Sequence, residues 1–102
     1  MKTAIKRLRR SKAKAEQGNF EFGVTEGRLW AEKEAEALEL ELLARTELDE
    51  GYTIDDVADL LHWDRDFLAN NVNVLLRYSP KFAEGYVTGA LVVFAEAFGD
   101  TL

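Results

Sequence analysis

Two stretches of this sequence repeat one pattern of aromatic residues and glycines, 62 residues apart. The first is Phe20-x-x-Gly23-x-x-x-Gly27-x-x-Trp30, and the second is Phe82-x-x-Gly85-x-x-x-Gly89, followed by Val92-Val93-Phe94. Each stretch has the apolar spacing of a helix, in which a glycine is less favourable than an alanine by about 1 kcal/mol. Glycines four residues apart form a groove on one helix face, where a second backbone can approach. The pattern therefore predicts two long helices that cross closely.

The two helices could meet within one chain, or each could meet its own copy across a two-fold axis. We favour contact within one chain. The predicted crossing residues are Phe20, Gly23, Gly27, Trp30, Phe82, Gly85, Gly89 and Phe94. Small residues at this spacing also join helices in membranes. However, glutamates occur along the first helix, and no apolar run reaches the ~18–20 residues of a membrane span. We therefore expect no membrane partner.

Helix-end signals and apolar periodicity predict an all-α fold of four to five helices, with two short capped helices between the two long ones. Thr53 followed by Asp56 is typical of a capping box, and Asp64 is a typical N-cap. The pair Ser79-Pro80 ends one helix and begins the last, because proline is favoured at the first helical position.

The domain boundary is predicted from Gly18 and Asn19. Gly18 is typical of the position after a helix, and Asn19 is typical of the next N-cap. These residues divide a basic N-terminal helix or arm (residues 1–18) from a single helical domain (residues 19–102). The expected helices span residues 2–17, 20–45, 53–61, 64–78 and 80–98.

The charge is distributed unevenly along the chain. Seven basic residues precede the first acid, Glu16, and the rest of the chain has six basic and nineteen acidic residues. A basic head of this kind is typical of an arm that binds nucleic acid or an acidic partner. The alternative is a solvated tail that lies against its own acidic body.

Few residues could carry catalysis. His62 is the one histidine, and the two serines, Ser11 and Ser79, lie in the basic head and at a helix start. A serine–histidine–acid triad is therefore not indicated. The glutamates at positions 32, 34, 36, 39 and 41 lack the Glu-x-x-His pairs of di-metal bundles. We predict no enzyme activity, metal or cofactor, and the absence of cysteine favours a cytoplasmic location.

The segment from Thr53 to Leu75 has the elements of a two-helix motif. Ala58 provides a small residue in the first helix, Asp64 a cap, and Leu68 an inward position in the second. This segment resembles the helix-turn-helix of bacterial regulators, with His62 where that motif usually has glycine. The resemblance implies DNA binding through residues 53–77 and the basic arm. The candidate contacts are Lys6, Arg7, Arg9, Arg10, Arg65, Asn70, Asn71 and Asn73.

DNA binding is the alternative function rather than the favoured one. Asparagine can read adenine edges, but the five aspartates of the segment oppose phosphate contact. We predict instead a non-enzymatic interaction or regulatory protein, whose acidic body suits a basic surface on an unknown protein partner. A homodimer is also expected, because the apolar arc of residues 35–44 is wider than one partner surface covers. Its predicted face consists of Leu38, Leu40, Leu42 and Leu43.

Overall fold

The computed structural model describes residues 2–99, with side chains from residue 14 onward. Within this range the chain forms helices and no strand, which confirms the predicted all-α class. The helices are α1 (Lys2–Lys33), α2 (Ala37–Arg45), α3 (Ile54–Leu61), α4 (Arg65–Asn71), α5 (Val74–Arg77) and α6 (Pro80–Phe98). The count exceeds the expected four to five because two of the expected helices are interrupted, while the expected helix over residues 2–17 is continuous with the one that follows it.

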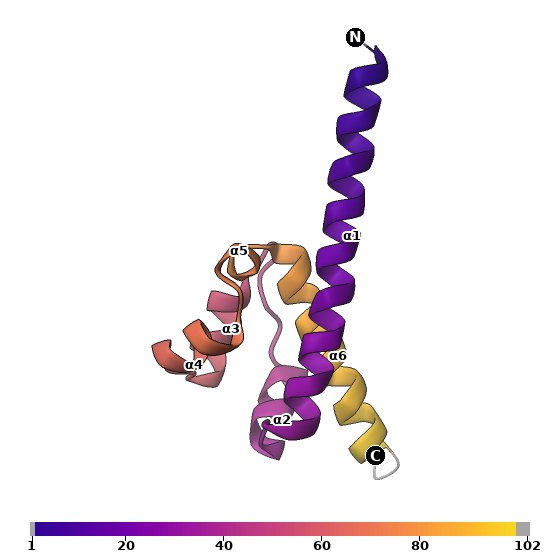
Figure 1. Cartoon of the computed structure of the whole chain (residues 1–102). Helices are drawn as coiled ribbons and strands as arrows, with labels where there is room; N and C mark the ends of the chain where they lie inside the picture. Colours follow the sequence, from indigo (N-terminus) through magenta and orange to yellow (C-terminus); the bar gives the residue numbers. More distant parts are fainter. Residues whose placement is uncertain (1, 100–102) are drawn as a thin grey trace.

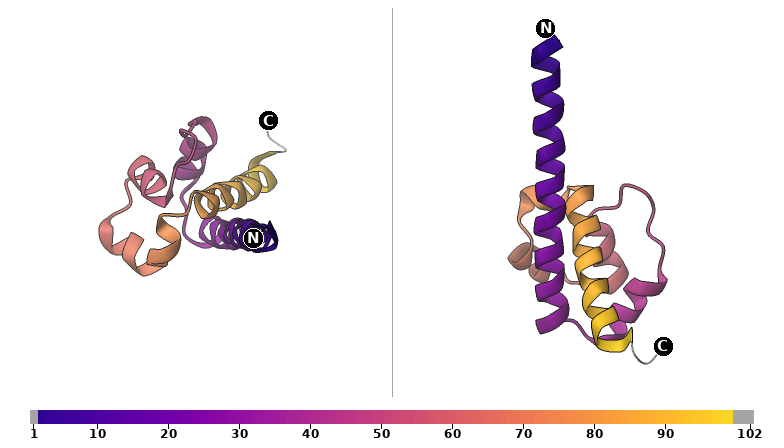
Figure 2. Two further views of the ribbon diagram at one scale, coloured as in Figure 1. Left: turned by 90° about the horizontal axis from the view of Figure 1, so that it is seen from above. Right: turned by 90° about the vertical axis from the view of Figure 1, so that its right-hand side faces the viewer.

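Helices α1 and α6 lie side by side and run in the same direction (Figure 1, Figure 2). Their contact begins near the start of α6, where Asn19 Nδ2 donates a hydrogen bond to Ser79 Oγ at 3.3 Å. At the other end, Arg28 forms an ion pair with Glu96 at 3.5 Å. The N-terminal part of α1 continues past α6 and projects from the rest of the molecule as a single helix (Figure 1).

The four glycines of the repeated pattern lie where these two helices touch. A Cβ atom added at Gly23 or Gly27 would fall closer than 3.0 Å to backbone atoms of α6. One added at Gly85 or Gly89 would fall equally close to backbone atoms of α1. The two patterned helices therefore meet within one chain, backbone against backbone.

The contacts between the two glycine patterns are reciprocal. Gly23 faces the Phe82 carbonyl and the Tyr86 amide, while Gly85 faces the Phe20 carbonyl and the Val24 amide. These partners correspond at the 62-residue spacing of the pattern. The pair is therefore related by an approximate two-fold axis. Of the aromatic residues expected beside the crossing, Trp30 and Phe82 are buried, and Phe20 and Phe94 are half-buried.

Residues 34–79 connect the end of α1 to the start of α6 and cover one side of the helix pair (Figure 1, Figure 2). A parallel pair requires such a crossover, because the chain must return to the end at which it began. The apolar core lies between this layer and the pair. Its largest fully buried side chains are Leu43, Ile54, Val57 and Phe82.

The predicted break at Gly18 and Asn19 is wrong, because α1 is continuous through both residues. Glycine tolerates helical φ and ψ as well as the left-handed conformation, and the residues on both sides of Gly18 are helical. The Asn19 side chain bonds to Ser79 instead of capping a helix. The boundary at residue 18 nevertheless lies near the point where α1 gains α6 as a neighbour.

The predicted helix over residues 20–45 is also wrong, because α1 ends at Lys33 and α2 begins at Ala37. Glu36 is the N-cap of α2, and its backbone N–H donates to Glu39 Oε1 at 3.0 Å. The wide apolar arc of residues 35–44 arises because α2 has a direction of its own and faces the core separately from α1.

The predicted dimer face is wrong at two of its four positions. Leu40 and Leu43 are only 4% and 2% exposed, because they pack into the core of their own chain. Leu42 is half-buried against the same core, and Leu38 alone of the four is exposed, at 74%. The predicted helix over residues 64–78 is interrupted at Val72, and Asn73 caps α5 by accepting a hydrogen bond from the Leu75 amide at 2.8 Å.

Candidate functional site

Four aromatic rings meet between α1, α6 and the turn that joins α3 to α4. Trp30 lies 5.4 Å from Trp63 and 5.8 Å from Tyr86, measured between ring centroids. Trp63 in turn lies 4.9 Å from Phe67 and 5.8 Å from Tyr86. Each of these separations is within the range of a favourable aromatic pair. The cluster therefore joins the crossover layer to the helix pair.

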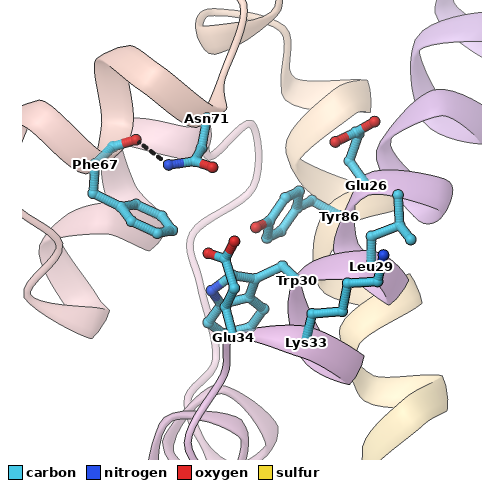
Figure 3. A pocket seen from close by; sticks show the side chains of 8 residues that line it. All are labelled: Glu26, Leu29, Trp30, Lys33, Glu34, Phe67, Asn71 and Tyr86. Carbon is cyan, nitrogen blue, oxygen red and sulfur yellow. Dashed lines mark hydrogen bonds between the residues drawn. The ribbon is translucent and has the colours of Figure 1, made fainter.

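Two adjoining pockets open on this cluster. The first has a volume of about 160 Å³ and is shown in Figure 3. It is lined by Glu26, Leu29, Trp30, Lys33, Glu34, Phe67, Asn71 and Tyr86. The second, of about 300 Å³, is lined by Trp30, Glu34, Glu39, Leu61, His62, Trp63, Asp64 and Phe67. The two pockets share Trp30, Glu34 and Phe67, so they are neighbours on either side of these residues.

The turn between α3 and α4 fixes the rings that come from the crossover layer. His62 ends α3 in the left-handed conformation (φ 58°, ψ 37°), and the Trp63 amide donates to the Ala58 carbonyl at 2.9 Å. Asp64 then caps α4 by accepting a hydrogen bond from the Phe67 amide at 2.6 Å. Trp63 and Phe67 are thus held on either side of a capped helix start.

Backbone bonds and burial fix the remaining parts of the first pocket. Asn71 Nδ2 donates to the Phe67 carbonyl at 2.9 Å, which keeps the amide group at the pocket rim (Figure 3). Trp30 and Tyr86 are 6% and 4% exposed, so their rings form the floor rather than the rim. The site is therefore apolar at its base and polar at its edge.

Carboxylates dominate the charge around the rings. Among the residues that line the two pockets, Glu26, Glu34, Glu39 and Asp64 are acidic, and Lys33 is the one basic residue. Burial raises the pKa of the Tyr86 hydroxyl above its ordinary range, and Glu34, Glu26 and Glu39 raise that pKa further. The same negative potential that disfavours a phenolate would stabilise a cation placed against the rings. This combination of aromatic faces and carboxylates suits a lysine or arginine side chain.

The residues considered for catalysis do not come together. His62 is exposed at the α3–α4 turn, and Ser79 caps α6 by accepting a hydrogen bond from the Phe82 amide at 3.2 Å. The Ser11 side chain lies outside the described residues. Within the part of the chain that the structure describes, histidine, aspartate and glutamate form no group of three placed to hold a metal ion.

The structure describes the side chains of only four of the eight predicted nucleic-acid contacts. The side chains of Lys6, Arg7, Arg9 and Arg10 lie outside the described residues, although their backbone belongs to the projecting part of α1. The other four, Arg65, Asn70, Asn71 and Asn73, are exposed on and after α4. Two of these already form local hydrogen bonds, Asn71 to Phe67 and Asn73 to Leu75. The cap predicted at Asp64 is confirmed.

Sequence reasoning missed the pocket pair. Its residues come from α1, α2, α3, α4, α6 and two connecting segments, so no single stretch has a periodic pattern that marks it. The signal that was available is the excess of aromatic residues near helix ends, of which Trp63 before the Asp64 cap is the clearest example.

A comparison of the chain with protein-family models, with curated proteins and with solved structures gives no match. None of the helices in residues 2–99 is both long enough and apolar enough to cross a membrane.

Proposed function

We propose that this chain is a non-enzymatic interaction protein that binds a basic segment of a partner protein in the pocket pair. The observation that carries the proposal is the presence of four carboxylates among the residues that line the two pockets, whose floor is formed by the buried side chains of Trp30 and Tyr86. A basic side chain could lay its apolar stem on Trp30 and Phe67 and place its charge beside Glu34. Arginine suits this geometry best, because its flat guanidinium stacks on rings and bonds carboxylates through two N–H groups.

Magnitudes support a binding site of moderate strength. A cation over an aromatic face contributes about 0.5–2 kcal/mol, depending on its desolvation. Each carboxylate at a partly exposed rim adds about 0.2–1 kcal/mol. The acidic body outside the head, with nineteen acids against six bases, would also speed the encounter with a basic partner by long-range attraction.

The test is a titration with an arginine-rich peptide, followed by the fluorescence of Trp30 and Trp63, which are the two tryptophans of the chain. We expect saturable binding that weakens as salt is added, and no response to a glutamate-rich peptide of equal length. Glu34→Gln should raise the Kd about five-fold, equivalent to about 1 kcal/mol. Glu41→Gln is the matched control, because Glu41 is exposed on α2 and lines neither pocket. Equal effects of the two variants would refute the proposed site.

One observation favours the alternative, a helix-turn-helix DNA binder. His62 adopts the left-handed conformation at the turn position where that motif usually has glycine. Against it, α4 has only 7 residues, and Asp64 and Asp66 lie at its start. A DNA shift assay with the full chain and a chain lacking residues 2–14 separates the two functions. Sequence-specific retention that is lost in Asn70→Ala would favour DNA binding, whereas weak binding that depends only on the head and on low salt would not.

A further inference from the structure

Two buried side chains at the floor of the pocket pair carry polar atoms without a partner. Tyr86 and Trp30 are only 4% and 6% exposed. Within the described residues, neither the Tyr86 hydroxyl nor the Trp30 indole N–H forms a hydrogen bond. Every fully covered side-chain nitrogen or oxygen in that part of the chain does have a partner. These two atoms are therefore open to the space that their residues line, and their hydrogen bonds are left for a molecule that enters it.

A carboxylate lies beside this floor. Figure 3 shows the Tyr86 hydroxyl, from α6, and the Glu34 carboxylate, from the segment after α1, both directed into the first pocket. Burial and, after it, the charge of Glu34 raise the pKa of Tyr86, so the hydroxyl keeps its proton at neutral pH. It can then both donate and accept a hydrogen bond, whereas the Trp30 indole can only donate.

These groups together define the chemistry of a ligand. The guanidinium of arginine and the ammonium of lysine suit the carboxylates, but they have no acceptor for the Trp30 indole. A carboxylate would supply acceptors, but the negative charges of Glu26 and Glu34 oppose it. The group that satisfies the whole floor has a positive charge with an oxygen acceptor close beside it.

We infer that the first pocket binds the free amino terminus of the basic partner segment. This inference rests on the proposed function and names the part of the partner that enters the site. An α-ammonium group has N–H donors, and the carbonyl oxygen of the same residue lies close to it. The ammonium can donate to the Glu34 carboxylate and to the Tyr86 oxygen, while the carbonyl accepts a hydrogen bond from the Trp30 indole.

Size and charge distinguish the roles of the two pockets. The first has a volume of about 160 Å³, below the ~300–1,000 Å³ of pockets that enclose drug-sized ligands, which suits the end of a chain with a small first residue. Its lining includes Lys33, which offsets one carboxylate and leaves room for a single positive charge. The second pocket, of about 300 Å³, is lined by Glu39 and Asp64 and by no lysine or arginine. An arginine that follows the first residue of the partner would lie there.

The experiment compares three short peptides of equal length, each titrated against the tryptophan fluorescence of the full chain. The first begins with alanine, followed by arginine, and has a free amino terminus. The second is the same peptide with an acetylated terminus. The third is acetylated and begins with lysine, which restores a positive charge on a flexible stem. We expect the free terminus to bind about ten-fold more tightly than either acetylated peptide, as for the loss of a hydrogen bond to a charged group.

Tyr86→Phe tests the geometry, because it removes the hydroxyl and keeps the ring. It should reduce the preference for the free terminus to about two- to three-fold and leave the affinity of the acetylated peptides unchanged. Tyr52→Phe is the matched control, because Tyr52 is half-buried but lines neither pocket, and it should keep the full preference. Circular dichroism of both variants checks that they are folded.

Each outcome bears on a different step. Equal affinities of the free and acetylated alanine peptides would overturn the inference and leave arginine binding in the pocket pair intact. Tight binding of the acetylated lysine peptide would also overturn it, because the site would then require a cation alone. A preference that is unchanged in Tyr86→Phe would place the amino terminus elsewhere and have the same effect. Binding of none of the three peptides would refute the proposed function together with the inference.

Discussion

Replacing Gly27 by alanine tests the closeness of the α1–α6 contact directly. In an isolated helix, alanine is more favourable than glycine by about 1 kcal/mol. Here the added methyl group would meet the backbone of Tyr86, closer than 3.0 Å, and backbone cannot move aside as a flexible side chain can. Overpacking of this kind costs about 1–3 kcal/mol, and a rigid neighbour favours the upper part of that range. We expect a net destabilisation of about 1–2 kcal/mol.

The matched control is Gly18→Ala in the same helix. An added Cβ at Gly18 has nothing within 4 Å, so only the helix propensity changes. The control should be neutral or more stable by up to ~1 kcal/mol. For a domain of this size, 1 kcal/mol corresponds to about 4–8 °C in Tm, so the two alanines should move thermal unfolding in opposite directions.

Thermal and urea unfolding, both followed by helical circular dichroism, provide the measurement. Leucine at Gly27 or Gly89 should lower the free energy of unfolding several times as much as alanine does, because more atoms must be accommodated. If Gly27→Ala were as stable as Gly18→Ala, the two backbones could not approach as closely as the structure describes, and the reasoning would fail.

Three further predictions concern the pocket region. His62→Gly should stabilise the fold by about 0.5–1 kcal/mol in urea unfolding, because a left-handed residue with a Cβ costs about 1–2 kcal/mol, part of which glycine returns as chain entropy. Asp64→Ala should destabilise it by about 1 kcal/mol through loss of the α4 cap, a result that Asp66→Ala, beside the cap, should not reproduce. The raised pKa of Tyr86 means that the folded state binds this proton more tightly than the unfolded state. The stabilisation from this proton is therefore complete below the ordinary tyrosine pKa of 10.0 and is lost as the pH rises above it. The free energy of unfolding falls by up to ~1.4 kcal/mol for each pH unit in that range. Tyr86→Phe should therefore lose less of its urea midpoint than the wild-type chain between pH 8 and pH 11.

Three helix starts were readable from the sequence, because their cause and effect lie within one helical turn. The Thr53 amide donates to Asp56 Oδ2 at 2.9 Å, which is the capping box that the sequence predicts. Asp64 caps α4 and Ser79 caps α6, with Pro80 in its first turn, again as predicted. These features need only residues three or four apart. The local signal at Gly18 and Asn19 was overridden, because α1 continues through both residues and Asn19 bonds to Ser79 instead.

Features that depend on tertiary packing were not readable in the same way. The apolar positions of residues 20–45 continue a helical period across the break after Lys33, because α1 and α2 each bury one face. Leu40 and Leu43 looked available for a second chain only because the crossover layer that buries them was unknown. The pocket pair depends on the same layer, since Phe67 approaches Tyr86 only after α4 has folded over the helix pair.

The parallel arrangement of α1 and α6 has a consequence for the order of folding. Among the described helices, α1 and α6 have the most extensive contact, yet their matching glycines are 62 residues apart in sequence. Contacts between distant residues require closure of a long loop before they yield any stabilisation, which slows folding relative to bundles of sequence-adjacent helices. During synthesis the glycine face of α1 stays exposed to solvent until α2–α5 and then α6 have emerged from the ribosome. A nascent chain that has not yet passed Gly89 therefore has helices but no completed core, and it is in this interval that the chain is most open to proteolysis or aggregation.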